Sequence, residues 1–150
     1  MNLKKFIVFF LLGIFCIVVG LYIIGRLYYT NERIIEESWN IDLPEGIEEE
    51  YYQHSEIGFQ GDGEHYHVFS SKGSESIDEF IRDFKTEKNP EMENKVTAIF
   101  DELAVPKNKR INFHEDYLWM VKFDSVDPRD TLYLIYQPST SKLYVIRDIY

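Results

Sequence analysis

Disulfide-forming cysteines, recognisable catalytic motifs and an excess of positive charge are all missing from this sequence. Cys16 is the single cysteine, so no intramolecular disulfide can form, and its place inside an apolar run suppresses the reactive thiolate. The chain contains no HExxH or GxSxG motif and no P-loop. Its formal net charge is −10, whereas neutralising phosphates requires clustered lysines and arginines. Thiol chemistry and nucleic-acid binding are therefore excluded, and no catalytic residue or cofactor is assigned.

Aromatic residues, by contrast, are plentiful. The 150 residues include 11 Tyr, 11 Phe and 2 Trp, which is enough to fill one compact core. This length accommodates one domain with an appendage.

An uncharged apolar run occupies residues 6–25. At about 1.5 Å per residue it would span about 30 Å, the hydrocarbon thickness of a bilayer. A cleaved signal peptide is the competing interpretation, but its apolar core is usually about 7 to 15 residues long and ends at small residues. Here the run is followed by Arg26 and Leu27. The sequence therefore predicts an uncleaved, single-pass transmembrane helix that contacts the lipid bilayer through residues 6–25.

Charge on either side of this run predicts an orientation. Lys4 and Lys5 precede it, and basic residues favour the cytoplasmic side. The expected location is the cell membrane, with the C-terminal domain extracytoplasmic. The expected boundaries are a cytoplasmic N-terminus at 1–5, a transmembrane helix at 6–25, an acidic juxtamembrane linker at 26–46 and an extracytoplasmic α+β domain at 47–150.

Acidic residues crowd the linker. Between Glu32 and Glu50 there are eight acids and one base, Arg33. Anionic lipid would repel such a segment, which suits a solvated stalk. It also suits docking of a basic protein partner.

Hydrophobic periodicity predicts an α+β fold with an antiparallel sheet. A first strand is expected over 49–59, followed by the strand of an N-terminal hairpin and two helices. Ser76 with Glu79 has the spacing of a capping box, and Asn89 before Pro90 is typical of a second helix start. Aromatic and β-branched segments at 116–123, 131–136 and 142–150 predict a C-terminal three-stranded meander.

The stretch "GFQGDGEHYHVFS", residues 58–70, places a glycine turn beside two histidines. A two-residue loop at Asp62-Gly63 would pair Phe59 with Tyr66 and Ile57 with Val68 on one apolar face. That register directs the two histidines to the opposite face, outside the main core.

His65 and His67 stand at i and i+2 and so project to the same side of a strand. With Glu56, or else His54, as a third ligand they could form a zinc-type site of nitrogen and oxygen donors. A solvated polar strand face is the alternative for the same residues.

The segment "GFQGDGEHYHVF" and the closing "LYLIYQPSTSKLYVIRDIY" resemble an uncharacterised family of small Gram-positive bacterial proteins with a GFxGDG hairpin motif. The resemblance extends over Gly58–Tyr150. It implies an α+β fold and a Gram-positive cell-envelope setting, and it implies no activity. Gln60 stands where that family is expected to carry a histidine.

Two functional hypotheses follow. The first is a membrane-anchored extracytoplasmic binding or protective module, immunity-like and without catalytic activity, whose acidic surface meets a basic partner. The second is a metal-dependent hydrolase or metal sensor that uses His65 and His67.

Overall fold

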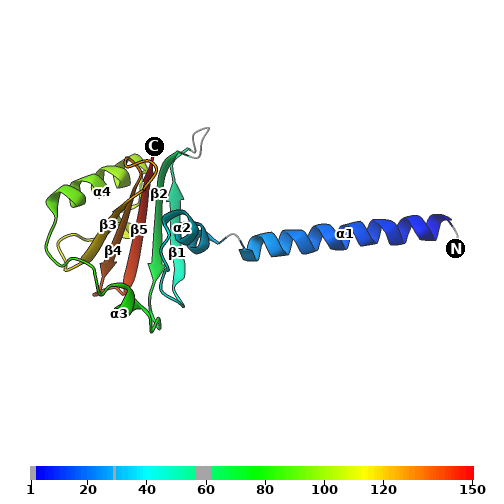
Figure 1. Cartoon of the computed structure of the whole chain (residues 1–150), viewed down its shortest axis with the longest axis horizontal. Helices are drawn as coiled ribbons and strands as arrows, with labels where there is room; N and C mark the ends of the chain where they lie inside the picture. The colour runs from blue at the N-terminus through cyan, green and yellow to red at the C-terminus, as the bar shows by residue number, and fades with distance from the viewer. Residues whose placement is uncertain (1–2, 29, 57–61) are drawn as a thin grey trace. The chain divides into compact units, whose positions relative to one another are not determined.

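The computed structural model describes residues 3–28, 30–56 and 62–150. The chain divides into two compact units, Met1–Leu43 and Pro44–Tyr150. Figure 1 labels the elements of both units, and each unit is described by itself.

The first unit holds two helices, α1 (Leu3–Tyr28) and α2 (Asn31–Trp39). Thr30 caps α2, because its side chain accepts a hydrogen bond from the Arg33 N–H. Asn40 ends the helix in the left-handed conformation with φ 47°, a conformation that asparagine tolerates. Local capping chemistry therefore sets both ends of α2.

The predicted transmembrane helix is contradicted. Over the residues that the structure describes, no helix is long and apolar enough to cross a membrane. The location of the chain in the cell stays a prediction.

The second unit is α+β, with a five-stranded antiparallel sheet in the order β1-β2-β5-β4-β3. Its strands are β1 (Glu48–His54), β2 (Gly63–Ser70), β3 (Leu118–Phe123), β4 (Thr131–Gln137) and β5 (Lys142–Ile149). The three C-terminal strands form the predicted meander. β5 then pairs with β2, which joins the meander to the N-terminal strand pair.

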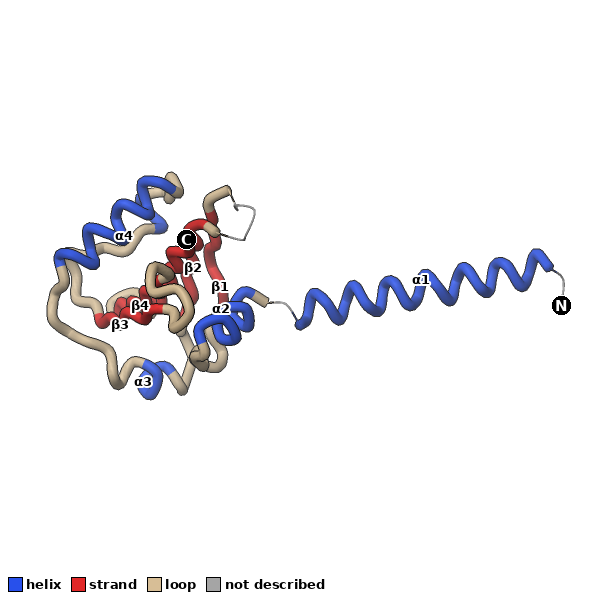
Figure 2. Tube along the Cα trace, turned by 45° about the horizontal axis from the view of Figure 1, so that its top comes forward, coloured by secondary structure: helices blue, strands red, loops and turns tan. Residues whose placement is uncertain are grey.

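Helix α4 (Pro90–Glu102) covers one face of this sheet, and Figure 2 shows it on one side of the strands. Asn89 caps it, because its side-chain oxygen accepts a hydrogen bond from the Met92 N–H at 3.1 Å. The apolar stripe of α4 is buried against the sheet, and each fully buried large side chain contributes about 1.5–3 kcal/mol. The core on this face includes Tyr66, Val68, Val96, Ile99, Phe100, Tyr133, Ile135, Tyr144 and Ile146.

The helix predicted after Ser76 is a single turn, α3 (Ile77–Phe80). Ser76 has φ −89° and ψ −6°, which is helical rather than the extended geometry of an N-cap. Its hydroxyl instead accepts a hydrogen bond from the Glu45 N–H at 2.8 Å. The capping-box prediction is wrong because a contact distant in sequence engages the capping oxygen. The remaining short element is the 3₁₀ helix η1 (Lys107–Lys109).

The hairpin register also differs from the prediction. β2 pairs with β1 so that Tyr66 lies opposite Gln53 and Val68 opposite Tyr51. The partners predicted for them, Ile57 and Phe59, lie outside the described residues. Tyr51 packs against the core opposite Val68, which is the position that the two-residue loop would have given to Ile57. β1 accordingly ends at His54, earlier than predicted.

Candidate functional site

His65 and His67 share one face of β2, as the strand period requires, but they are buried rather than solvated. His65 is 8% exposed and His67 is 0% exposed. Glu56 lies just beyond β1 and is exposed. In the described part of the chain, no three His, Cys, Asp or Glu side chains are arranged to hold a metal ion. The metal site predicted on these three residues gains no support from this geometry.

Five side chains from three strands form the histidine cluster: Glu49 and Tyr52 of β1, His65 and His67 of β2, and Arg147 of β5. The Nδ1 atom of His67 lies 2.8 Å from Glu49 Oε1, and its Nε2 lies 3.3 Å from Arg147 Nη2. The Tyr52 hydroxyl lies 3.0 Å from His65 Nδ1. The Tyr52 ring also stacks on His67 with centroids 4.5 Å apart. Strand pairing assembles the cluster, since β2 lies between β1 and β5.

These contacts assign the protons on both rings. A guanidinium can only donate, so Nε2 of His67 accepts from Arg147 and its Nδ1–H donates to Glu49. Burial raises the pKa of Tyr52, which therefore keeps its proton and donates it to His65. Neutral imidazoles satisfy every one of these hydrogen bonds.

Electrostatics favour the same neutral state. Burial, together with the nearby Arg147, His67 and His54, lowers the pKa of His65 to about 4. Burial also lowers the pKa of Arg147, while Tyr52 and Glu49 oppose that shift. The Nε atom of Arg147 is buried without a hydrogen-bond partner among the described residues. The cluster is therefore a polar network, buried at His65, His67 and Arg147, that ties β1, β2 and β5 together.

A cavity of about 320 Å³ lies beside β3, the last strand in the sheet order. Trp119, Val121 and Phe123 line it from β3, and Tyr133 lines it from β4. Met92 contributes from α4. Phe123 is 62% exposed, although it is a large apolar residue. The cavity therefore has an apolar, accessible wall along β3, which among the described strands pairs only with β4.

The backbone of β3 is open along part of this edge. Trp119 exchanges two backbone hydrogen bonds with Lys85, at 2.8 and 2.9 Å, so its peptide groups face away from β4. The Asp124 N–H donates to the Asp130 C=O on the opposite side of the strand. This agrees with the rule that successive residues of a strand direct their backbone groups to alternate sides. Val121 and Phe123 therefore also direct their N–H and C=O groups outward. No strand in the described ranges pairs with them there.

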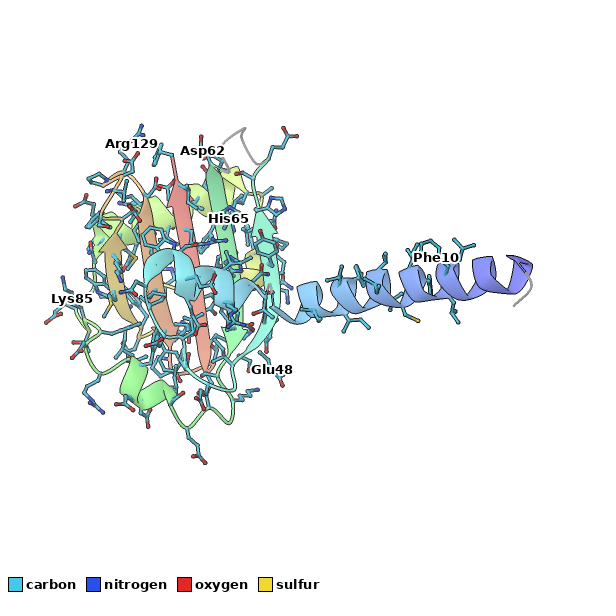
Figure 3. The ribbon with its side chains drawn as sticks, turned by 45° about the vertical axis from the view of Figure 1, so that its right-hand side comes forward. Phe10, Glu48, Asp62, His65, Lys85 and Arg129 are labelled. Carbon is cyan, nitrogen blue, oxygen red and sulfur yellow. The ribbon has the colours of Figure 1, made fainter. Side chains whose placement is uncertain are left out.

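A second cavity of about 310 Å³ shares two lining residues, Lys95 and Tyr133, with the first, and its other walls come from α4, β2, β4 and β5. Its wall carries three carboxylates, from Glu64, Glu102 and Asp148. We call the first cavity the edge groove and the second the acidic cavity. Figure 3 labels Lys85, which lines the first cavity, and Arg129, which lines the second. The edge groove and the acidic cavity thus differ in chemistry.

Like charges lie next to each other in the acidic cavity. Glu64 of β2 and Asp148 of β5 are cross-strand partners, an arrangement that is destabilising for two acids. Burial raises the pKa of Asp148, and Glu64, Glu102 and Asp130 raise it further. Glu102 is the last residue of α4, where the helix dipole disfavours a negative charge.

Comparison with protein-family models, curated proteins and solved structures gives no match for this chain. The resemblance to a GFxGDG family therefore stays a prediction.

Sequence reasoning missed the edge groove. It assigned residues 116–123 to a strand. The position of that strand in the sheet depends on which distant segments pair with it, and the sequence of the strand alone does not determine this. The alternation of Trp119, Val121 and Phe123 indicates one apolar face. Glu64 and Asp148 are far apart in sequence, and only the β2–β5 pairing brings them together.

Proposed function

We propose that residues 44–150 form a non-catalytic binding or protective module that takes up an extended segment of another protein along β3. The observation that carries this proposal is the open backbone edge at Val121 and Phe123, directly beside a cavity whose β3 wall is apolar. An added strand gains main-chain hydrogen bonds from such an edge, and alternate side chains enter the pockets beside it.

The energetics favour a selective, moderate affinity. Each new backbone hydrogen bond contributes about 0.5–1.5 kcal/mol net. Burial of an apolar side chain in the cavity adds about 25 cal/mol per Å² removed from water. The open edge is short, because the Lys85–Trp119 bridge occupies its beginning. Short open edges limit indiscriminate strand pairing, so side-chain fit to the groove must contribute to selection.

The histidine cluster is a less suitable binding site than the β3 edge. Both ring nitrogens of His67 are engaged, by Glu49 and Arg147. A substrate or metal would have to displace these partners from a fully buried ring.

A display library of random extended peptides, selected against the full-length protein, tests the proposal. The Val121→Pro variant should weaken selected peptides about tenfold or more, because proline removes the outward N–H and obstructs the edge. The matched control is His54→Pro on the opposite edge of the sheet. Its N–H also faces outward, because the neighbouring Ser55 donates its N–H inward to Glu64. Binding should survive in this control.

A second measurement covers the case in which Val121→Pro does not fold. N-methylation of single peptide amides should weaken binding at alternate positions only, because every second amide of an added strand faces β3. Failure to select any peptide, or a uniform response to methylation at all positions, would overturn the proposed function.

A further inference from the structure

We propose that the segment bound along β3 is the carboxyl-terminal tail of its partner, added antiparallel to β3, with the terminal carboxylate beside the Lys85 ammonium. This inference rests on the proposed function and specifies its partner. The observation behind it is that the Lys85–Trp119 bridge closes one end of the open edge, where Lys85 also lines the edge groove as a cation.

The bridge blocks an added strand at the beginning of β3. Lys85 exchanges two backbone hydrogen bonds with Trp119, so it occupies the place that an added strand would need opposite Trp119. The bridge is isolated, because the Phe84 N–H bonds to the Ile81 C=O at 3.0 Å in a turn and does not continue along the edge. A ligand that is hydrogen-bonded to Val121 must therefore end, or leave the edge, next to Lys85.

Strand direction decides which end of the ligand meets the bridge. The four strand pairs of the described sheet are antiparallel, and antiparallel pairing is slightly more stable per residue than parallel pairing. β3 runs from Leu118, beside the bridge, to Phe123. A strand added antiparallel to it therefore brings its carboxyl end to the bridge. A chain that ends there needs no bend, whereas an internal segment has to turn out of the line of the sheet.

Lys85 supplies the positive charge that suits a terminal carboxylate. Its ammonium lies 4.7 Å from the ring centroid of Trp119, which also lines the groove, and it forms no ion pair within the described ranges of the chain. Among the described residues, the other cation lining the groove is Lys95, which lies 3.4 Å from Glu91 and is already paired. Lys85 is thus the groove cation left to meet an incoming anion.

Asp83 also lines the groove and would repel a carboxylate. It is exposed in the turn before the bridge, so water and salt screen its charge. A segment added in the parallel direction would instead bring its amino terminus to this end, with Asp83 as the countercharge. The two directions make opposite predictions for Lys85 and Asp83, so variants at these positions separate them.

The groove accepts side chains from alternate positions of this tail. Cross-strand partners project to the same face, so the ligand residues opposite Val121 and Phe123 both face the groove, about 7 Å apart. Trp119, Val121 and Phe123 give the groove its apolar β3 wall. A tail that ends opposite Val121 therefore carries apolar side chains at its last and third-from-last residues, followed by the free carboxylate.

The overall charge of the protein opposes this preference. A net charge of −10 by itself favours the less negative of two ligands. Stronger binding of a free carboxylate than of the uncharged amide therefore requires a local cation and does not follow from long-range attraction.

Peptides with apolar residues at the last and third-from-last positions test this inference on the full-length protein. They are taken from a library displayed with free carboxyl ends, and each is made as the free acid, as the terminal amide, and with two serines added after the last residue. The acid should bind about fivefold more tightly than the amide at low salt, the scale of one partly screened ion pair, and the difference should shrink as salt rises. The extended form should bind more weakly than the acid, because its chain runs into the bridge.

Lys85→Met identifies the cation. It keeps an apolar stem over Trp119 and leaves the backbone bridge in place, so it should weaken the acid about fivefold and leave the amide unchanged. Lys107→Met removes an exposed lysine that does not line the groove, and this charge-matched control should retain the wild-type preference. Asp83→Asn should bind the acid at least as tightly as the wild type does.

The outcomes separate the two proposals. Equal binding of the acid and the amide, with the loss at Val121→Pro intact, would refute capture of a terminal carboxylate and leave strand addition standing. A preference for the acid that Lys85→Met reduces no more than Lys107→Met does would overturn the assignment of Lys85. Weaker binding after acetylation of the amino terminus and in Asp83→Asn, with no effect of amidation, would show the parallel direction and overturn the inference. Absence of binding by every peptide would overturn the proposed function itself.

Discussion

Single residues in the histidine cluster tie the stability of the second unit to pH. His65 is buried beside Arg147 and His67, and each of these surroundings disfavours its protonated form. The folded-state pKa of about 4 is below the ordinary value of 6.5, so the unfolded chain binds the proton more readily. Stability linked to His65 is therefore complete above pH 6.5 and is lost as the pH falls toward 4.

The His65→Gln variant should flatten this dependence. Between pH 6.5 and 4, the wild-type free energy of unfolding should fall more steeply than that of the variant. The difference is at most about 1.4 kcal/mol per pH unit, the value for one proton. Urea denaturation at stepped pH measures it. His114→Gln, which removes an exposed histidine outside the cluster, is the control, and identical slopes in wild type and His65→Gln would contradict the argument.

At the level of elements, α4 is the helix whose local signals and tertiary contacts agree most fully. Asn89 caps it and Pro90 occupies its first turn. Glu91 and Glu93 also lie in this turn, where their negative charge interacts favourably with the positive end of the helix dipole. The apolar stripe then packs on the sheet. α3 lacks this agreement, because Ser76 bonds to Glu45 instead of capping. The helix with both kinds of support has 13 residues, whereas α3 has 4.

Asn89→Ala should destabilise the protein by about 1 kcal/mol, because the Met92 N–H loses its capping acceptor. Asn89→Asp keeps an acceptor at the same position and should stay within a few tenths of a kcal/mol of the wild type. Denaturant midpoints at constant m-value report the change. Equal midpoints for the alanine and aspartate variants would show that the cap contributes nothing.

Across the whole molecule, negative charge dominates. The net charge of −10 resists compaction by self-repulsion, and the acidic cavity concentrates part of that repulsion in one place. Solvent-exposed charges are screened by salt over about 10 Å at 0.1 M. Ionic strength is thus expected to stabilise this protein, whereas it would weaken a fold that depends on surface ion pairs.

Raising NaCl from 10 to 200 mM should increase the melting temperature by about 2–4 °C, equivalent to roughly 1 kcal/mol for a chain of this size. Asp148→Asn should show a smaller increase, since one source of repulsion is already gone. Scanning calorimetry measures both. A melting temperature that falls with salt would indicate that favourable ion pairs outweigh the acidic excess.

Much of the second unit could be predicted from local patterns. The meander strands begin within two residues of their predicted starts, and the Asn89-Pro90 start of α4 is confirmed. The β1–β2 register could not be predicted, because the sequence offers two apolar partners for Val68, Tyr51 and Ile57. Val68 pairs with Tyr51. The burial of His65 and His67 was also missed, since strand alternation defines a face and not its environment.

By itself, the sequence determined the α+β class, the capped helix and the acidic character of the chain, because periodicity, capping residues and charge act over a few neighbouring positions. Tertiary structure alone decided that β3 ends the sheet, that Glu64 meets Asp148, and that Arg147 meets His67. These are contacts between segments distant in the chain. They depend on strand order and register, which are properties of the assembled sheet rather than of any single segment.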